Sequence, residues 1–370
     1  MSDKAELELP DKTIIDGVST AGGAHCETTA LGVLLRHAGL DLSEPMLFGL
    51  GSGLSFIYWD SKRQELPFLG GRVKPFVLAQ NLAQRLGLEL RVRETTSSRR
   101  AWDQVRSSID DGIPVGLQLD SHDLEYFGSR VHFAGHVVAM YGYDAERAYL
   151  VDTAQQGGAV STSLESLARA RAARGPMAAR HRSFTVRVPA SNTDGGHLIP
   201  AIIPAITACA ESFLAPPITN LGNRGIRTAA KRAQSWFDRV EDPGRDLAVI
   251  STMMERAGTG GALFRNLYRD FLTECQGLLE GKSGADLVGQ GRDLFAESAL
   301  LWTSVAELIE KAGATGRPDH LANASQLLDD IATIETSAMT ALSSLTLVRH
   351  PSDEHKLLRM GEDGLRSPSR

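Results

Sequence analysis

The sequence predicts an α+β region followed by an all-α region. In the first half, helical patterns come first and apolar strand patterns follow, which is typical of an α+β fold. A polar, glycine-bearing linker at 190–196 marks a change, because strand patterns vanish beyond it. We therefore expect a catalytic α+β domain over 1–190, a helical domain over 191–350 and a disordered tail over 351–370.

Composition limits the classes of protein to consider. The chain has 370 residues, 42% of them hydrophobic and 23% charged, which fits a soluble protein with two domains of ordinary size. A net charge of −6 and the absence of a basic stripe argue against a nucleic-acid partner. The polar, acidic N-terminus does not resemble a signal peptide. The longest apolar run, 198–214, contains two prolines and a glutamate, so we expect no membrane span.

Cysteine usage points to a reducing compartment. The chain has three cysteines, Cys26, Cys209 and Cys275. They are widely spaced and odd in number, which matches neither a disulfide framework nor a zinc site. We therefore predict a cytoplasmic protein with no bound metal.

The elements of the first half follow from local signals. A helix is expected from Cys26 to His37, with apolar residues at helical spacing and Gly39 after its end. A second helix starts after Ser43, an N-cap residue, with Pro45 in its first turn. The remaining helices are predicted over 75–86 and 98–111, and the strands over 13–15, 88–93, 113–119, 131–143, 148–152 and 182–189.

The second half is predicted to be helical throughout. Pro, Gly and Asp clusters separate helical stretches at 198–214, 225–240, 244–257, 262–281, 284–313 and 319–346. Arg265, Tyr268 and Arg269 lie in one of these stretches. Their side chains could face a partner or a cleft, but a solvated helix face is the simpler interpretation.

The central motif is the glycine-rich loop that runs into Cys26. A sulfur at the N-terminus of a helix lies where the helix dipole and free backbone N–H groups stabilise a thiolate. The alternative is a small buried cysteine on an apolar helix face, which needs no chemistry. Later features of the sequence favour the catalytic interpretation.

Those features are a His and an Asp on successive strands. His136 begins an apolar strand pattern, and Asp152 ends the next one. A helical Cys followed by a His and an Asp on strands is the order of a papain-like nucleophile, base and orienting residue. His132 is an alternative base, since residues four apart on a strand face the same side. We prefer His136, because a central strand pattern follows it, and we assign no base role to His25.

Two smaller assignments complete the predicted site. Asp152 could instead be a turn residue, as Asp144 is expected to be. The backbone N–H of Cys26 is the expected oxyanion donor, and a side-chain donor could come from Ser19 or Thr20 in the preceding loop.

A second glycine-rich segment follows the second helix. Its glycines, which include Gly51 and Gly53 on either side of Ser52, alternate in a way that fits no nucleotide-binding motif. The segment could be a simple turn or a wall of the active-site cleft. We predict substrate contacts at Gly51, Ser52, Gly53 and Thr20.

Several of these segments resemble one known family. The motifs at 25–28, 48–56, 135–138 and 151–153 resemble the N-terminal domain of the butirosin biosynthesis protein H family. The segments at 222–226 and 258–272 look like the helical domain often fused to it. The resemblance covers nearly the whole chain. Its His and Asp motifs are shared with C39-type and other papain-like peptidases.

The resemblance implies a papain-like fold used for acyl transfer. An acyl group would pass from a phosphopantetheine thioester on an acyl carrier protein to Cys26, and then to an amine of a small natural product. His136 would be base and acid, and Asp152 would orient it. No other cofactor is implied. Papain-like peptidases place a Gln oxyanion donor six residues before the nucleophile, whereas this chain has Thr20 there.

Two other classes of function remain open at this stage. The same three residues fit a papain-like hydrolase, which would be a peptidase, an amidase or a thioesterase. A noncatalytic binding protein could also keep the fold, and an unreactive Cys26 would support it. The sequence does not name the acyl chain or the acceptor. Both a monomer and a homo-oligomer are compatible with it.

Overall fold

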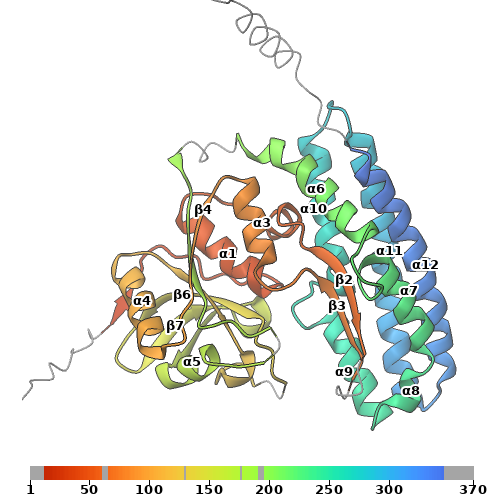
Figure 1. The fold of residues 1–370 in the computed structure, drawn as a ribbon, viewed down its shortest axis with the longest axis horizontal. Helices are drawn as coiled ribbons and strands as arrows, with labels where there is room; N and C mark the ends of the chain where they lie inside the picture. The colour runs from red at the N-terminus through yellow and green to blue at the C-terminus, as the bar shows by residue number, and fades with distance from the viewer. Residues whose placement is uncertain (1–11, 61–65, 129–130, 176, 191–195, 346–370) are drawn as a thin grey trace, which may run out of the picture.

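A computed structural model describes residues 12–60, 66–128, 131–175, 177–190 and 196–345. The predicted tail at 351–370 lies outside the described residues, as does most of the predicted linker. An α+β region and a region of long helices lie side by side (Figure 1). The predicted fold class, α+β followed by all-α, is therefore confirmed.

The α+β region is built on one antiparallel sheet. Within the described residues seven strands form it, in the order β4-β9-β5-β6-β7-β8, with β1 beside β6. Each strand pairs antiparallel with its neighbour. The strands are β1 (Thr13–Ile14), β4 (Glu89–Arg93), β5 (Val115–Leu119), β6 (His136–Tyr143), β7 (Arg147–Val151), β8 (Ala159–Ser163) and β9 (Ser183–Arg187). The sequence did not predict β8.

Alternation along β6 assigns the helices to two faces of this sheet. Val137 and Ala139 join the larger hydrophobic core, together with apolar residues of α1 (Cys26–His37) and α3 (Val77–Arg85). Val138 and Met140 point the other way, toward a second core with residues of α4 (Ser98–Asp110) and α5 (Leu164–Arg171). The predicted nucleophile helix therefore lies on the opposite face of the sheet from α4 and α5.

The second half of the chain is helical, as predicted. Its helices are α6 (Leu198–Leu214), α7 (Gly222–Ala233), α8 (Trp236–Arg239), α9 (Pro243–Glu255), η4 (Ala262–Phe264), α10 (Arg265–Leu278), α11 (Ala285–Thr315) and α12 (Asp319–Ser343). The bounds of α6 match the predicted stretch. No helix in the described part of the chain could span a bilayer.

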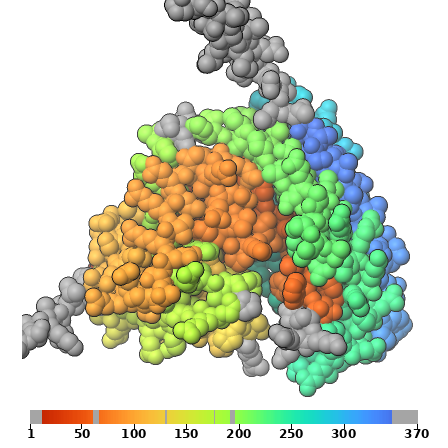
Figure 2. Space-filling model, in the orientation of Figure 1, coloured from red at the N-terminus to blue at the C-terminus, as the bar shows by residue number. Residues whose placement is uncertain are grey.

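A hairpin from the first half lies among these helices. It consists of β2 (Leu54–Trp59) and β3 (Phe68–Arg72), which the sequence did not predict. The amide of Tyr58 donates to the Asn220 carbonyl, and the Trp236 indole donates to the Tyr58 hydroxyl at 3.1 Å. In Figure 2 the red-orange surface of the hairpin lies among green atoms of the helical region. The two regions are thus joined by more than the linker.

The interior of the helical region corrects one expectation. Arg265 and Tyr268 are fully buried and do not lie on a solvated face. The guanidinium of Arg265 makes two hydrogen bonds of 2.8 Å to the Glu335 carboxylate, which is also buried. The sequence pattern predicted an exposed Arg265, because a local pattern cannot show that Glu335, 70 residues away, pairs with its charge. Arg269 is partly exposed and pairs with Asp270.

The contact between α2 (Glu44–Leu50) and α10 gives a testable prediction. A Cβ atom added at Gly49 would lie 2.0 Å from Cγ of Phe271, so Gly49→Ala forces these helices apart. We expect a loss of about 1–3 kcal/mol in the free energy of unfolding, measured in urea by tryptophan fluorescence. Gly277→Ala is the matched control, because a Cβ there meets no atom within 4 Å and adds helix propensity. An unfolding midpoint for Gly49→Ala at or above that of the wild type would contradict the packing.

Candidate active site

The loop before α1 is fixed by one carboxylate. Glu44, in the first turn of α2, accepts hydrogen bonds from the amides of Ala24 and His25 at 2.8 and 2.7 Å. It also accepts from the Thr28 hydroxyl at 2.8 Å. The chain therefore enters α1 in a defined direction, and Cys26 becomes the first residue of the helix. Backbone N–H groups of this first turn have no partner within the helix, as an oxyanion donor requires.

Glycine in this loop has a steric reason. A Cβ atom at Gly22 would lie within 2.5 Å of the Asp152 carbonyl and the Thr153 backbone. The Gly23 carbonyl accepts from the Ala154 amide at 2.8 Å. The loop therefore runs directly against the end of β7, which brings Asp152 into the neighbourhood of Cys26.

The three predicted catalytic residues come together in this structure. Nε2 of His136 lies 2.8 Å from Oδ2 of Asp152, and the His136 side chain also hydrogen-bonds the Cys26 thiol. All three residues are buried. Because β6 and β7 are paired strands, the His at the start of one meets the Asp after the end of the other. This is the geometry of a papain-like nucleophile, base and orienting residue.

The site favours a charged pair over a neutral one. Burial by itself would raise the pKa of the Cys26 thiol, but His136 and His25 outweigh it and hold that pKa well below its ordinary value. Burial would lower the pKa of His136, but Asp152 and Cys26 raise it to about 10. At neutral pH the geometry thus favours a thiolate beside an imidazolium.

Two aromatic residues that the sequence did not single out support His136 and Asp152. The Tyr126 hydroxyl donates to Oδ2 of Asp152 at 2.7 Å, and the Phe127 ring meets the His136 ring edge-on at 5.0 Å. The Thr153 amide donates to the other oxygen of Asp152 at 2.7 Å. Burial, with Asp152 beside it, raises the pKa of Tyr126, which therefore stays a hydrogen-bond donor. These residues lie in irregular segments, which carry no periodic signal.

The alternative base, His132, lies elsewhere. Its Nδ1 pairs with Asp120 at 2.9 Å, its ring stacks on His122 at 3.9 Å, and its side chain is 69% exposed. Residues 131–135 are not part of β6, so the rule that residues four apart share a face does not apply. The structure brings His136 to Cys26 and not His132.

His25 lies closer to the chemistry than expected. It is the N-cap residue of α1, where it helps to lower the pKa of the Cys26 thiol, and its Nδ1 lies 3.3 Å from the Thr28 hydroxyl. The rings of Phe48 and Phe264 meet it edge-on at 6.1 and 5.3 Å and stack on each other. Phe264 belongs to the helical region, which therefore contributes a wall beside the nucleophile.

The predicted substrate contacts have different positions. Gly51, Ser52 and Gly53 form a buried turn at the end of α2, where the Ser52 hydroxyl donates to the Ala205 carbonyl at 2.8 Å. A Cβ at Gly53 would lie 2.8 Å from Phe48 atoms. The turn packs α2 against α6, and its burial does not fit the wall of an open cleft. Thr20 is exposed in the loop before Cys26, and its role stays a prediction.

In the described ranges, no cluster of three or more His, Cys, Asp or Glu side chains is arranged to hold a metal ion. The other two cysteines, Cys209 and Cys275, are buried, and burial raises the pKa of Cys209 to about 11. Of the three thiols, Cys26 is the one whose pKa is lowered by its surroundings.

Comparisons with known proteins place the two regions. Residues 25–153 match the family model "Butirosin biosynthesis protein H, N-terminal", and residues 165–342 match "Domain of unknown function (DUF4872)". A comparison with curated proteins gives no match. One similar solved structure is described as a C39-like peptidase from Bacillus anthracis, with 17% identity and a TM-score of 0.34 over 48% of this chain and 98% of that chain. The first region is thus similar to the N-terminal domain of the butirosin biosynthesis protein H family over residues 25–153, and the rest of the chain is similar to a domain of unknown function over residues 165–342.

Proposed function

We propose that the protein is a cysteine-dependent acyltransferase that forms an amide through an acyl group bound to Cys26. The observation that carries the proposal is the buried, hydrogen-bonded series Cys26–His136–Asp152, with the sulfur at the N-terminus of α1. The proposed donor is a phosphopantetheine thioester on an acyl carrier protein. The proposed acceptor is an amine of a small natural product. The family match supports a biosynthetic role over protein degradation.

The first half-reaction forms the acyl-enzyme. The Cys26 thiolate attacks the thioester carbonyl, and the backbone N–H groups at the start of α1 stabilise the oxyanion. When the tetrahedral intermediate collapses, the carbon–sulfur bond to the carrier breaks. The leaving thiolate takes the proton of the His136 imidazolium, so a free carrier thiol and neutral His136 result. One thioester replaces another, so the step needs no ATP.

The second half-reaction forms the amide. The acceptor amine attacks the Cys26 thioester, and His136 takes a proton from the attacking nitrogen. The Cys26 thiolate leaves, and the thiolate–imidazolium pair is restored. Water would give hydrolysis by the same route. Burial of Cys26, with Phe264 packed on the neighbouring His25, favours the amine, because it limits access of water to the thioester.

The helical region has a proposed part in this chemistry. A Cβ atom at Gly260 would lie 3.7 Å from Ala24, so the loop before η4 packs on the loop that carries the nucleophile. The backbone of η4, which follows this loop, is unusual, since Ala262, Leu263 and Phe264 all have positive φ angles. We propose that this loop covers the acyl group and that the helical region docks the carrier protein.

Intact-protein mass spectrometry tests the proposal. Wild type and Cys26→Ala are mixed with N-acetylcysteamine thioesters as donor surrogates and then with a primary amine. We expect an acyl adduct on the wild type alone, released by the amine faster than by water. Faster release by water, or cleavage of a peptide without any donor, would support the hydrolase. A wild type that forms no adduct and reacts sluggishly with iodoacetamide would favour a binding protein.

A further inference from the structure

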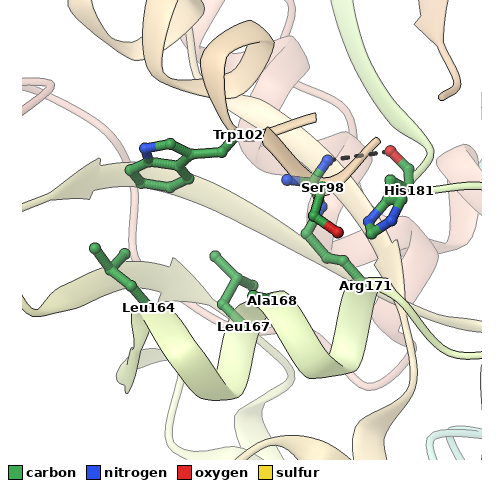
Figure 3. Close-up of a pocket in the computed structure, with 7 residues that line it drawn as sticks. All are labelled: Ser98, Trp102, Leu164, Leu167, Ala168, Arg171 and His181. Carbon is green, nitrogen blue, oxygen red and sulfur yellow. Dashed lines mark hydrogen bonds between the residues drawn. The ribbon is translucent and has the colours of Figure 1, made fainter. Parts of the chain in front are cut away.

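A pocket lies on the other side of the sheet from Cys26. It occupies about 250 Å³ between α4 and α5 (Figure 3). Its walls are largely apolar, with Trp102 from α4 and Leu164 and Leu167 from α5. Because α4 and α5 share the core opposite α1, this pocket is separate from the proposed acyl-transfer site.

One end of the pocket holds a buried arginine. Arg171 is 4% exposed, and its side chain runs from α5 toward the start of α4 (Figure 3). Its Nη1 donates to the Ala101 carbonyl at 3.3 Å, and its Nη2 donates to the His181 carbonyl at 3.1 Å. Its Nε donates to no atom of the described residues. Within the described part of the chain, the guanidinium of this pocket-lining residue is therefore only partly hydrogen-bonded.

The charge of Arg171 is also uncompensated. No carboxylate within the described ranges pairs with it, whereas the other deeply buried arginine, Arg265, is paired with Glu335. Burial lowers the pKa of Arg171 to about 10, so the side chain is still a cation at neutral pH. A buried cation without a counter-charge costs free energy, and buried charges in proteins are ordinarily paired.

The backbone at this end of the pocket is strained. His181 has a φ of 48°, in the left-handed region, and it offers both its ring to the pocket and its carbonyl to Arg171. Burial and the nearby Arg171 lower the pKa of His181, so it adds no second positive charge at neutral pH. Strain of this kind persists where the surroundings require a particular geometry.

We infer that this pocket binds a small organic carboxylate with an apolar body. The carboxylate supplies the missing counter-charge and an acceptor for the Arg171 guanidinium, and the apolar body packs against Trp102, Leu164 and Leu167. The start of α4 at Ser98, which also lines the pocket, adds the positive end of a helix dipole. A volume of about 250 Å³ suits a single ring or a short chain.

Calorimetric titration of the full-length protein with sodium benzoate tests this inference. Benzamide, which has the same shape without the charge, is the ligand control. We expect benzoate to bind and benzamide to bind at least about tenfold more weakly, because hydrogen bonds to charged groups are the stronger ones. Arg171→Gln is expected to weaken benzoate binding by a factor of about ten or more. Arg169→Gln, on the exposed side of the same helix, is expected to leave it unchanged.

A second variant keeps the test decisive if Arg171→Gln does not fold. Ala168 lines the pocket from an exposed position of α5, so Ala168→Leu fills the space without changing the charge. We expect it to abolish benzoate binding while the alkylation rate of Cys26 stays unchanged. The inference is overturned if benzoate does not bind the wild type, if benzamide binds equally well, or if Ala168→Leu binds benzoate as the wild type does.

Discussion

Replacing His136 with Asn is expected to slow acyl-adduct formation by about three orders of magnitude or more. Two losses combine: the thiolate loses its imidazolium neighbour, and the leaving thiol loses its proton donor. Alkylation by iodoacetamide depends on the first loss alone. An ordinary thiol is only a few per cent thiolate at pH 7, so alkylation should fall by up to about thirtyfold. His25 remains beside the sulfur and limits the fall.

The pH dependence of alkylation separates these effects. In the wild type the rate should already be on its plateau at neutral pH, because the pKa of Cys26 is held low. In His136→Asn the plateau should move to higher pH, and alkylation there should recover while acyl transfer does not. His132→Asn is the matched control, since His132 pairs with Asp120 away from Cys26. Equal pH profiles for the wild type and His136→Asn would rule out the thiolate–imidazolium pair.

Replacing Glu335 with Gln is expected to lower the free energy of unfolding by about 3–5 kcal/mol. The substitution leaves the Arg265 guanidinium buried without a counter-charge. It also weakens the hydrogen bonds that Ser298 and Trp302 donate to the same carboxylate at 2.6 and 2.8 Å. Arg265 additionally donates to the Ser55 carbonyl at 3.3 Å, so the damage should extend to the hairpin β2–β3.

Urea unfolding followed by tryptophan fluorescence measures this loss, because Trp302 lies beside the pair. Asp319→Asn is the matched control, since it removes an exposed partner of Arg317 and should leave the midpoint nearly unchanged. A double variant, Arg265→Met with Glu335→Leu, should recover part of the loss because no unpaired charge remains. An unchanged midpoint for Glu335→Gln alone would show that the pair contributes little to stability.

Local signals predicted much of the fold. Two helices have the predicted bounds, Cys26–His37 and Leu198–Leu214. In each, apolar residues at helical spacing mark the helix and turn residues mark its ends. The hairpin β2–β3 was missed for a physical reason. Its strands are short, β3 contains two consecutive glycines, and their burial comes from α7 and other helices far along the chain. A signal that depends on distant partners is not visible locally.

The candidate site was predictable only in part. The order of Cys26, His136 and Asp152 along the chain was enough to group them, since Cys26 begins a helix, His136 begins a strand and Asp152 directly follows the next strand. The roles of Glu44 and Tyr126 could not be predicted from the sequence. They depend on how α2 and an irregular loop fold back onto the site. We gave His25 no base role because side chains at the start of a helix point in different directions. His25 is the N-cap residue, however, and its backbone is extended, so the side-chain directions of a helix do not apply to it.

The position of Phe264 against His25 has a consequence for how the site forms during synthesis of the chain. During synthesis the nucleophile leaves the ribosome early, whereas its aromatic wall follows more than 230 residues later, the separation of Cys26 and Phe264 in the sequence. A nascent chain therefore holds an unfinished site for most of its synthesis. Because β2 also packs against α7, the hairpin β2–β3 and the wall beside the nucleophile both need the helical half, whereas Cys26, His136 and Asp152 all belong to the first half.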